Sequence, residues 1–215
     1  MSKKRKKLTK QFEIRDIRFN DLRDYQEALN ASNNHLEKFL DWGIQATKYD
    51  SKQCKYILDM MINDSYPNRN FAICYKGKLV GEICFSSGSR PDGLQITYWV
   101  SKKYAGMGLC SKAVKKLVEK SFYLEDINFL EIHADKRNLA SIQVAKKSGF
   151  IHYDSYEYSS KGTEGIGIMD VFIYLTPRAR YVETISKLQW REGLDLNIRP
   201  DNWRRKHELT LVKTG

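Results

Sequence analysis

The chain has 215 residues, 41% of them hydrophobic, and a formal net charge of +11. This length fits one domain with its own core and is too short for two. No apolar run reaches membrane-spanning length and none follows the N-terminal charges, so we expect a cytoplasmic protein without signal peptide or transmembrane helix. The four cysteines form neither a CxxC pair nor a metal-site spacing, which predicts reduced thiols and no metal.

The positive charge is concentrated at the ends of the chain. Residues 1–10 carry six Lys or Arg and no Asp or Glu, and residues 177–215 carry nine against five. Residues 11–176 are nearly neutral, with 22 against 21. We therefore divide the chain into a basic, flexible leader (1–10), a folded domain (11–176) and a basic C-terminal extension (177–215). Attraction to polyanions should act through the two ends.

The first half of the domain begins with a strand pattern. Residues 12–18 (FEIRDIR) alternate like a half-buried strand, and Asn20-Asp21 starts a helix that runs through Asn30. Apolar residues at helical spacing predict helices over 35–44 and 52–62. Three strand-like runs follow at 70–77, 78–86 and 94–100, the first two joined by a hairpin turn at Lys76-Gly77-Lys78.

The second half continues with a helix, a strand, a helix and two strands. A helix begins at Leu109 and places on one face Ala113, Val114, Leu117, Val118 and Phe122. Residues 129–135 form an apolar strand, and Asn138 caps a helix that stops at Gly149. Strands over 150–158 and 169–175 end the domain. This order predicts a mixed α/β fold around one sheet.

Gly106 and Gly108 lie between the strand at 94–100 and the helix that begins at Leu109. Glycines there let the backbone approach a ligand, and the unpaired N–H groups of the first helical turn favour an anion. The segment lacks the third glycine of a dinucleotide-binding GxGxxG pattern and the GK[ST] of a Walker loop. It predicts either another kind of phosphate-binding loop or an ordinary tight turn.

Two motifs make the chain similar to a known superfamily. Lys103-x-x-Gly106-x-Gly108 resembles the [QR]xxGx[GA] acetyl-CoA loop of the GNAT N-acetyltransferases, and residues 138–150 (NLASIQVAKKSGF) resemble their NxxSxxVxxKxGF segment. Over residues 12–176 the chain is most similar to the Rim-type ribosomal-protein N-terminal acetyltransferases. The resemblance implies a GNAT-like fold, in which helices flank one mixed, mostly antiparallel sheet.

The same resemblance implies how acetyl-CoA binds. Residues 103–109 hold its pyrophosphate through main-chain N–H groups, backbone near Trp99 and Val100 lines the pantetheine arm, and Asn138 and Ser141 face that arm. Lys103 stands where Gln or Arg is usual, which keeps the charge but loses the forked guanidinium. The predicted cofactor-binding residues are Trp99, Val100, Lys103, Tyr104, Ala105, Gly106, Met107, Gly108, Leu109, Asn138 and Ser141.

The resemblance further implies direct attack of an amine on the acetyl thioester. Gln95, which cannot serve as a base, occupies the place where the family often carries a carboxylate. Glu157, Glu131 and His133 remain as alternatives for the general base, each being otherwise a solvated or hydrogen-bonded strand residue. Ser141 is the candidate proton donor to the leaving thiolate.

The weak base pattern bears on the acceptor. At pH 7 roughly a tenth of an α-amine is neutral, against roughly a few parts in ten thousand of a lysine amine. We therefore expect the N-terminal α-amine of a protein, such as a ribosomal protein, as acceptor. The alternatives are an aminoacyl-tRNA, a small-molecule amine, or a non-catalytic ribosome- or RNA-associated module. The basic ends disfavour a polycation such as spermidine.

The C-terminal extension has two interpretations. An amphipathic segment around Tyr181, Ile185 and Trp190 could pack on the domain. Alternatively, Trp203 beside Arg204-Arg205-Lys206 forms an aromatic and basic contact for RNA.

Overall fold

The structure is a computed structural model. It describes residues 11–32, 36, 39, 48–65, 68–124, 126–159, 166–177 and 179. The predicted leader, nearly all of the helix expected at 35–44 and nearly all of the C-terminal extension lie outside the described residues.

Within the described residues, seven strands form one sheet in the order β1-β2-β3-β4-β5-β7-β6. Their bounds are β1 (Phe12–Asp16), β2 (Arg69–Tyr75), β3 (Lys78–Ser87), β4 (Gly93–Val100), β5 (Phe129–Asp135), β6 (Ile151–Ser159) and β7 (Ile166–Leu175). Every neighbouring pair is antiparallel except β4 and β5. The predicted mixed, mostly antiparallel sheet is confirmed. The predicted hairpin is also present, with positive φ angles at Lys76 and Gly77.

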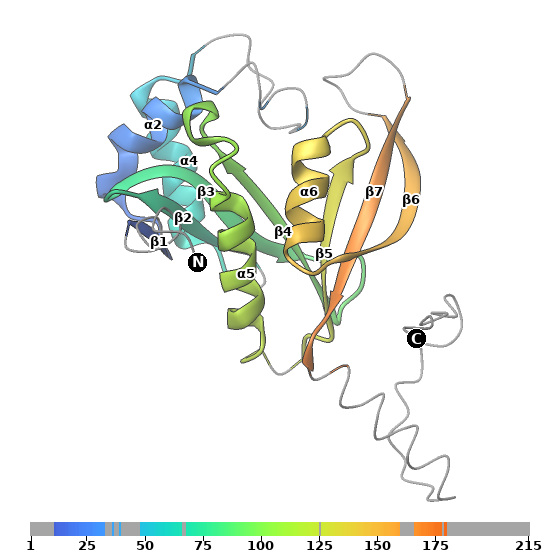
Figure 1. The fold of residues 1–215 in the computed structure, drawn as a ribbon. Helices are drawn as coiled ribbons and strands as arrows, with labels where there is room; N and C mark the ends of the chain where they lie inside the picture. The colour runs from blue at the N-terminus through green and yellow to red at the C-terminus, as the bar shows by residue number, and fades with distance from the viewer. Residues whose placement is uncertain are drawn as a thin grey trace, which may run out of the picture.

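Helices cover both faces of the sheet (Figure 1). They are α2 (Leu22–Asn30), α4 (Ser51–Asn63), α5 (Leu109–Ser121) and α6 (Leu139–Lys147), with the short 3₁₀ turns η1 (Phe19–Asp21) and η3 (Lys102–Tyr104). One apolar cluster joins the sheet to α5 and α6 through residues such as Ile96, Leu117 and Ile132. A second cluster, which includes Tyr25, Leu58 and Trp99, joins the opposite face to α2 and α4.

The two parallel strands at the centre of the sheet pair over a short distance only. Gly93, Leu94 and Gln95 of β4 pair with Phe129, Leu130 and Glu131 of β5, and no later residues of the two strands are paired. Beyond this point the strands diverge into a V (Figure 1). The ends of β4 and β5 therefore expose backbone and side chains that a continuous sheet would cover.

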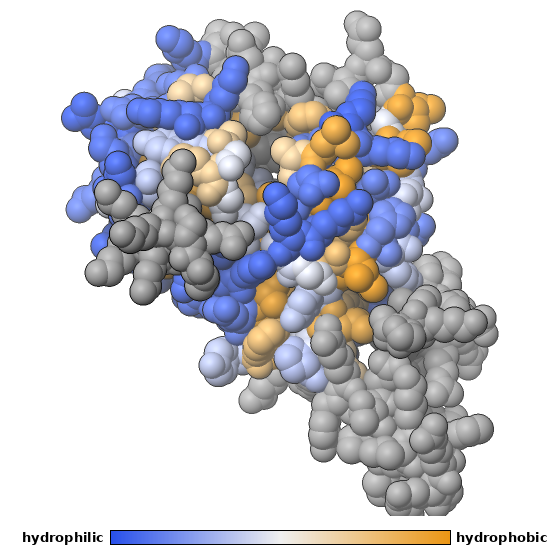
Figure 2. Space-filling model, viewed as in Figure 1, coloured by the Kyte–Doolittle hydropathy of each residue, from blue (hydrophilic) through white to orange (hydrophobic). Residues whose placement is uncertain are grey.

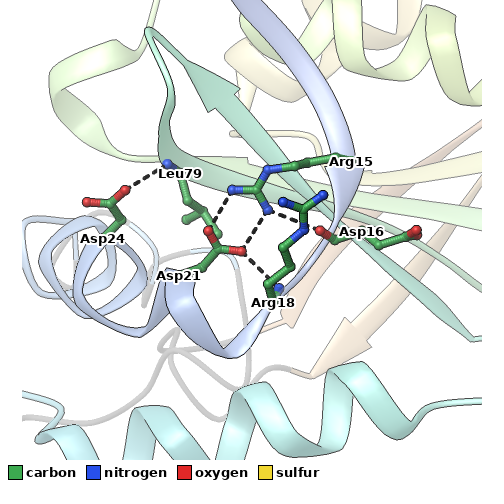
Figure 3. A network of polar contacts seen from close by, with 6 residues as sticks. All are labelled: Arg15, Asp16, Arg18, Asp21, Asp24 and Leu79. Carbon is green, nitrogen blue, oxygen red and sulfur yellow. Dashed lines mark hydrogen bonds and ion pairs between the residues drawn. The ribbon is translucent and has the colours of Figure 1, made fainter.

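A buried ion pair fixes β1 against the start of α2 (Figure 3). Asp21, 5% exposed, accepts hydrogen bonds from Arg15 at 2.6 and 2.8 Å and from the Arg18 N–H at 2.9 Å. Burial opposes the charged form of Asp21, but the hydrogen bonds from Arg15 and Arg18 outweigh it and lower the pKa. β1 ends at Asp16, two residues earlier than predicted, because the chain turns here to bring Asp21 back to Arg15.

Candidate functional site

A cleft of about 320 Å³ opens where β4 and β5 diverge. The second half of β4, the end of β5, the glycine loop with the first turn of α5, and one side of α6 line it. Thr97 and Trp99 contribute from β4, His133 and Asp135 from β5, and Ser141 from α6. The short β4–β5 pairing thus joins the two halves of the sheet at one end, and the cleft separates them at the other.

The glycine loop forms one end of the cleft. Gly106 and Gly108 have φ angles of +74° and +76°, and a Cβ built on either would meet no atom within 4 Å. The first intrahelical bond of α5 runs from the Lys112 N–H to the Gly108 carbonyl, at 3.2 Å. The N–H groups of residues 109–111 therefore have no acceptor within the helix, while these residues line the cleft. Open space beside unpaired N–H groups fits a phosphate or pyrophosphate.

A pair of hydroxyl groups lies on the opposite wall. Asn138 caps α6 by accepting the Ser141 N–H at 3.1 Å, which places Ser141 in the first turn, facing β4. The Ser141 Oγ is 2.9 Å from the Tyr98 hydroxyl oxygen, and the Tyr98 hydroxyl also donates to the Ser141 carbonyl at 3.2 Å. Burial raises the pKa of Tyr98, so this hydroxyl keeps its proton.

Glu131, His133 and Asp135 share one face of β5, but only the latter two line the cleft. Glu131 is 1% exposed and accepts the Ser89 N–H at 2.5 Å and the Ser89 Oγ–H at 2.7 Å. Burial opposes its charge, but the contact with His133 at 3.4 Å and the hydrogen bonds from Ser89 lower the pKa of Glu131 overall. Glu131 is therefore an ionised carboxylate that anchors the loop after β3.

The negative charge of Asp135 is balanced by a neighbouring arginine. Arg137 donates to its two carboxylate oxygens at 2.9 and 2.6 Å, and the Tyr158 hydroxyl donates as well. The Arg137 hydrogen bond is the main reason that the pKa of Asp135 falls to about 2. Among the described residues that line the cleft, Asp135 is the only carboxylate, so the cleft offers no uncompensated negative charge.

Glu157 lies on the other face of β6. Tyr156 contacts His133 and Tyr158 contacts Asp135, so their side chains point to the face of the sheet that carries those two residues. Glu157, between them, pairs with Ile168 and is exposed on the α6 side. It does not line the cleft.

Most of the cofactor-binding residues predicted from the sequence lie around this one cleft. All of them except Lys103 and Met107 line the cleft. The sequence analysis missed Tyr98 and Asp135, although alternation along 94–100 and 129–135 would have placed both on identifiable faces. The roles assigned to Ser141, Glu131 and Glu157 remain predictions.

Apolar residues lie at the surface near this region. Figure 2 shows orange residues over the starts of α6 and β7, where Leu139 and Ile166 are 69% and 72% exposed. No group of three or more His, Cys, Asp or Glu within the described ranges is placed to hold a metal ion. The same part of the chain contains no helix long and apolar enough to cross a membrane.

Comparison with known proteins assigns the family. The profile of the acetyltransferase (GNAT) domain matches residues 11–151. The chain belongs to the GNAT acetyltransferase family. It is accordingly an N-acetyltransferase that uses acetyl-CoA, as the two sequence motifs implied. No curated protein sequence matches this GNAT chain significantly.

Solved structures share the GNAT fold at low identity. Microcin C7 self immunity acetyltransferase MccE, solved with acetyl-CoA and AMP, is 15% identical with a TM-score of 0.69, covering 77% of this chain and 92% of its own. The ribosomal L7/L12 α-N-protein acetyltransferase RimL, solved with CoA, is 16% identical (TM-score 0.68, covering 77% and 94%). Spermidine N-acetyltransferase from Vibrio cholerae, with CoA and spermine, is 13% identical (0.64, covering 80% and 99%).

Proposed function

We propose that this enzyme acetylates the N-terminal α-amine of a protein, with acetyl-CoA bound in the cleft between β4 and β5. The observation that carries the proposal is the open glycine loop at the start of α5, directly beside the V of the sheet. The N–H groups of residues 109–111 would hold the pyrophosphate. Trp99, Val100, Asn138 and Ser141 would line the pantetheine arm that leads to the divergence of the strands.

The chain's own groups suit direct transfer. When bound, acetyl-CoA supplies an activated acetyl group as a thioester. The Ser141 hydroxyl donates a proton toward the sulfur of the leaving thiolate, and the Tyr98 hydroxyl, 2.9 Å from the Ser141 Oγ, positions it. Asn138 acts by positioning, because its side chain fixes the first turn of α6.

The charge of the cleft favours an α-amine. A polyamine carries several positive charges and needs several carboxylates, whereas Asp135 is neutralised by Arg137 and no other carboxylate occurs among the described lining residues. An α-amine enters neutral in an appreciable fraction at pH 7. The exposed apolar residues Leu139 and Ile166 offer further contacts for a polypeptide acceptor. Of the structural neighbours, RimL acts on such an N-terminus and supports the same choice.

The test is thiol release from acetyl-CoA with a panel of acceptors. It contains peptides that begin with Ala or Ser, an N-terminally blocked peptide with one internal lysine, spermidine and an aminoacyl-tRNA. We expect turnover with the free N-terminal peptides. Faster turnover with spermidine, the lysine peptide or the tRNA would contradict the proposed acceptor.

We further propose that the chain works in the cytoplasm as one catalytic domain (11–176) with basic ends. The division is supported by the net charge, which is nearly zero over residues 11–176 and positive in both flanking segments.

A further inference from the structure

Few groups along the cleft can take a proton from an amine. Burial raises the pKa of Cys110 to about 12, and it also raises the pKa of Tyr98. Asp135 is bound by Arg137 and by the Tyr158 hydroxyl. His133 also lines the cleft, with its side chain 16% exposed, and an imidazole exchanges protons readily near neutral pH. Among the described lining residues it is the one imidazole, the side chain most often used as a general base.

The two ring nitrogens of His133 have different surroundings. Nε2 is buried and lies 3.4 Å from Oε1 of Glu131, which its two contacts with Ser89 hold ionised. Nδ1 lies 3.2 Å from the Tyr156 hydroxyl oxygen, on the partly exposed side. A carboxylate beside Nε2 favours the tautomer with the proton on Nε2, so that Nδ1 accepts the hydrogen bond from the Tyr156 hydroxyl.

The remaining groups around His133 do not compete for this role. On the same face of the sheet, β4 contributes Gln95 and Thr97, which do not titrate, and β7 places Val171 opposite His133. Beyond Val171, Asp154 of β6 is exposed and bound to the Ser155 N–H. Glu131 is thus the buried carboxylate, free of an Arg partner, that faces the imidazole.

We propose that His133 is the general base for the acceptor amine and that Glu131 is the residue that positions it, a proposal that rests on the proposed function. The Tyr156 hydroxyl passes its proton to Nδ1 as it takes one from the ammonium form of the acceptor, and Glu131 stabilises the resulting imidazolium. The amine nitrogen then forms a bond to the acetyl carbonyl carbon as the carbon–sulfur bond breaks. The second proton lost by nitrogen goes to the sulfur by way of Ser141, and the imidazolium returns its proton to water.

The experiment compares His133→Gln with wild type in the full chain. It uses the acceptor that wild type acetylates fastest, together with the aminooxy analogue of that acceptor, which is already uncharged at pH 7. If the proposed acceptor class is wrong, wild type will acetylate another class of acceptor faster. If the proposed base is wrong, the ratio of the variant's kcat to that of wild type will be the same for the amine and for its aminooxy analogue. His152→Gln is the matched control, because His152 is exposed on β6 and does not line the cleft.

We expect His133→Gln to lower kcat by about 100-fold with the amine and by less than about threefold with the aminooxy analogue. Acetyl-CoA affinity should stay within about threefold, and added imidazole should restore part of the rate. Glu131→Gln should also lower kcat with the amine, by about tenfold, and spare the aminooxy analogue, a selective loss that a purely structural role would not produce. Equal losses on the two acceptors, in either variant, would overturn the proposal.

Discussion

Single residues set the backbone geometry at the glycine-loop end of the cleft. Gly106 and Gly108 adopt left-handed φ angles, and the space on their Cβ side is open. A side chain at either position would be disfavoured by backbone conformation rather than by a clash, and it would project into space that we assign to acetyl-CoA. Gly77 shares the positive φ and the open Cβ space but lies in the β2–β3 hairpin, outside the cleft.

This contrast gives the residue-scale prediction. Gly108→Ala and Gly77→Ala should each reduce the free energy of unfolding by about 1 kcal/mol, because alanine is strained at positive φ. Only Gly108→Ala should also raise the KM for acetyl-CoA, by about tenfold or more, since 1.4 kcal/mol of lost binding equals tenfold. Urea unfolding and steady-state kinetics measure the two effects. A similar rise in KM for Gly77→Ala would show that the effect is not local.

At the scale of elements, N-caps fix helices α4 and α6. Asp50 accepts the Gln53 N–H at 2.8 Å at the start of α4, and Asn138 accepts the Ser141 N–H at 3.1 Å at the start of α6. Both caps satisfy an N–H group of the first turn, but only Asn138 lines the cleft. The same local interaction therefore has a functional consequence in one helix only.

We expect Asp50→Ala and Asn138→Ala to destabilise the fold by similar amounts, about 1 kcal/mol each. Asn138→Ala should in addition lower kcat/KM, because the first turn of α6 carries Ser141. Thermal unfolding and thiol release on the same preparations test this pair. If Asp50→Ala reduced kcat/KM as strongly, loss of stability alone would account for both variants.

Because of the contact between β1 and α2, the free energy of unfolding should depend on pH in the acid range. The pKa of Asp21 in the folded state lies below its ordinary value of 3.8, so its contribution is complete above about pH 3.8 and is lost as the pH falls through the folded-state pKa. Asp21→Asn should lower the free energy of unfolding by about 2 kcal/mol at pH 7, and the difference should shrink below pH 3.8. Urea titrations across this range measure it; a difference independent of pH would contradict the assignment.

At the scale of the whole molecule, the excess positive charge lies in the ends of the sequence and not in the domain that contains the cleft. The described cleft has a neutralised carboxylate, whereas residues 177–215 carry nine Lys or Arg against five Asp or Glu. Contact with RNA, if made by the extension, would then be independent of the acetyl transfer site. The two properties can be tested with substitutions that remove equal charge from different places.

We expect a variant with Arg204, Arg205 and Lys206 changed to Gln to bind RNA more weakly and to reduce the slope of log K against log salt by about 2 to 3. Its rate with an N-terminal peptide should be unchanged. The matched control replaces three lysines of α5, Lys115, Lys116 and Lys120, all of them exposed. Equal loss of RNA binding in the two variants would indicate that only net charge matters, not the extension.

The sequence by itself determined the features that depend on neighbouring residues. Periodicity placed α5 and β5, the Asn138 cap placed α6, and the glycine pair marked the left-handed turn before α5. These are local because hydrogen-bonded caps, left-handed turns and amphipathic faces arise within a few residues. Family motifs in the same segments added acetyl-CoA, and the profile match agrees with them.

Tertiary structure decided which polar side chains meet. Ser89 donates a hydrogen bond to Glu131, which is 42 residues away in the sequence, and the hydroxyl groups of Tyr98 and Ser141 are hydrogen-bonded across a separation of 43 residues. The side of the sheet that Glu157 faces depends on one extra residue in β6, between His152 and Asp154. Without this bulge, Glu157 would share a face with His133, because strand side chains alternate and a one-residue shift reverses them. Strand pairing between distant segments, which no local pattern encodes, thus selects the groups that can act in the cleft.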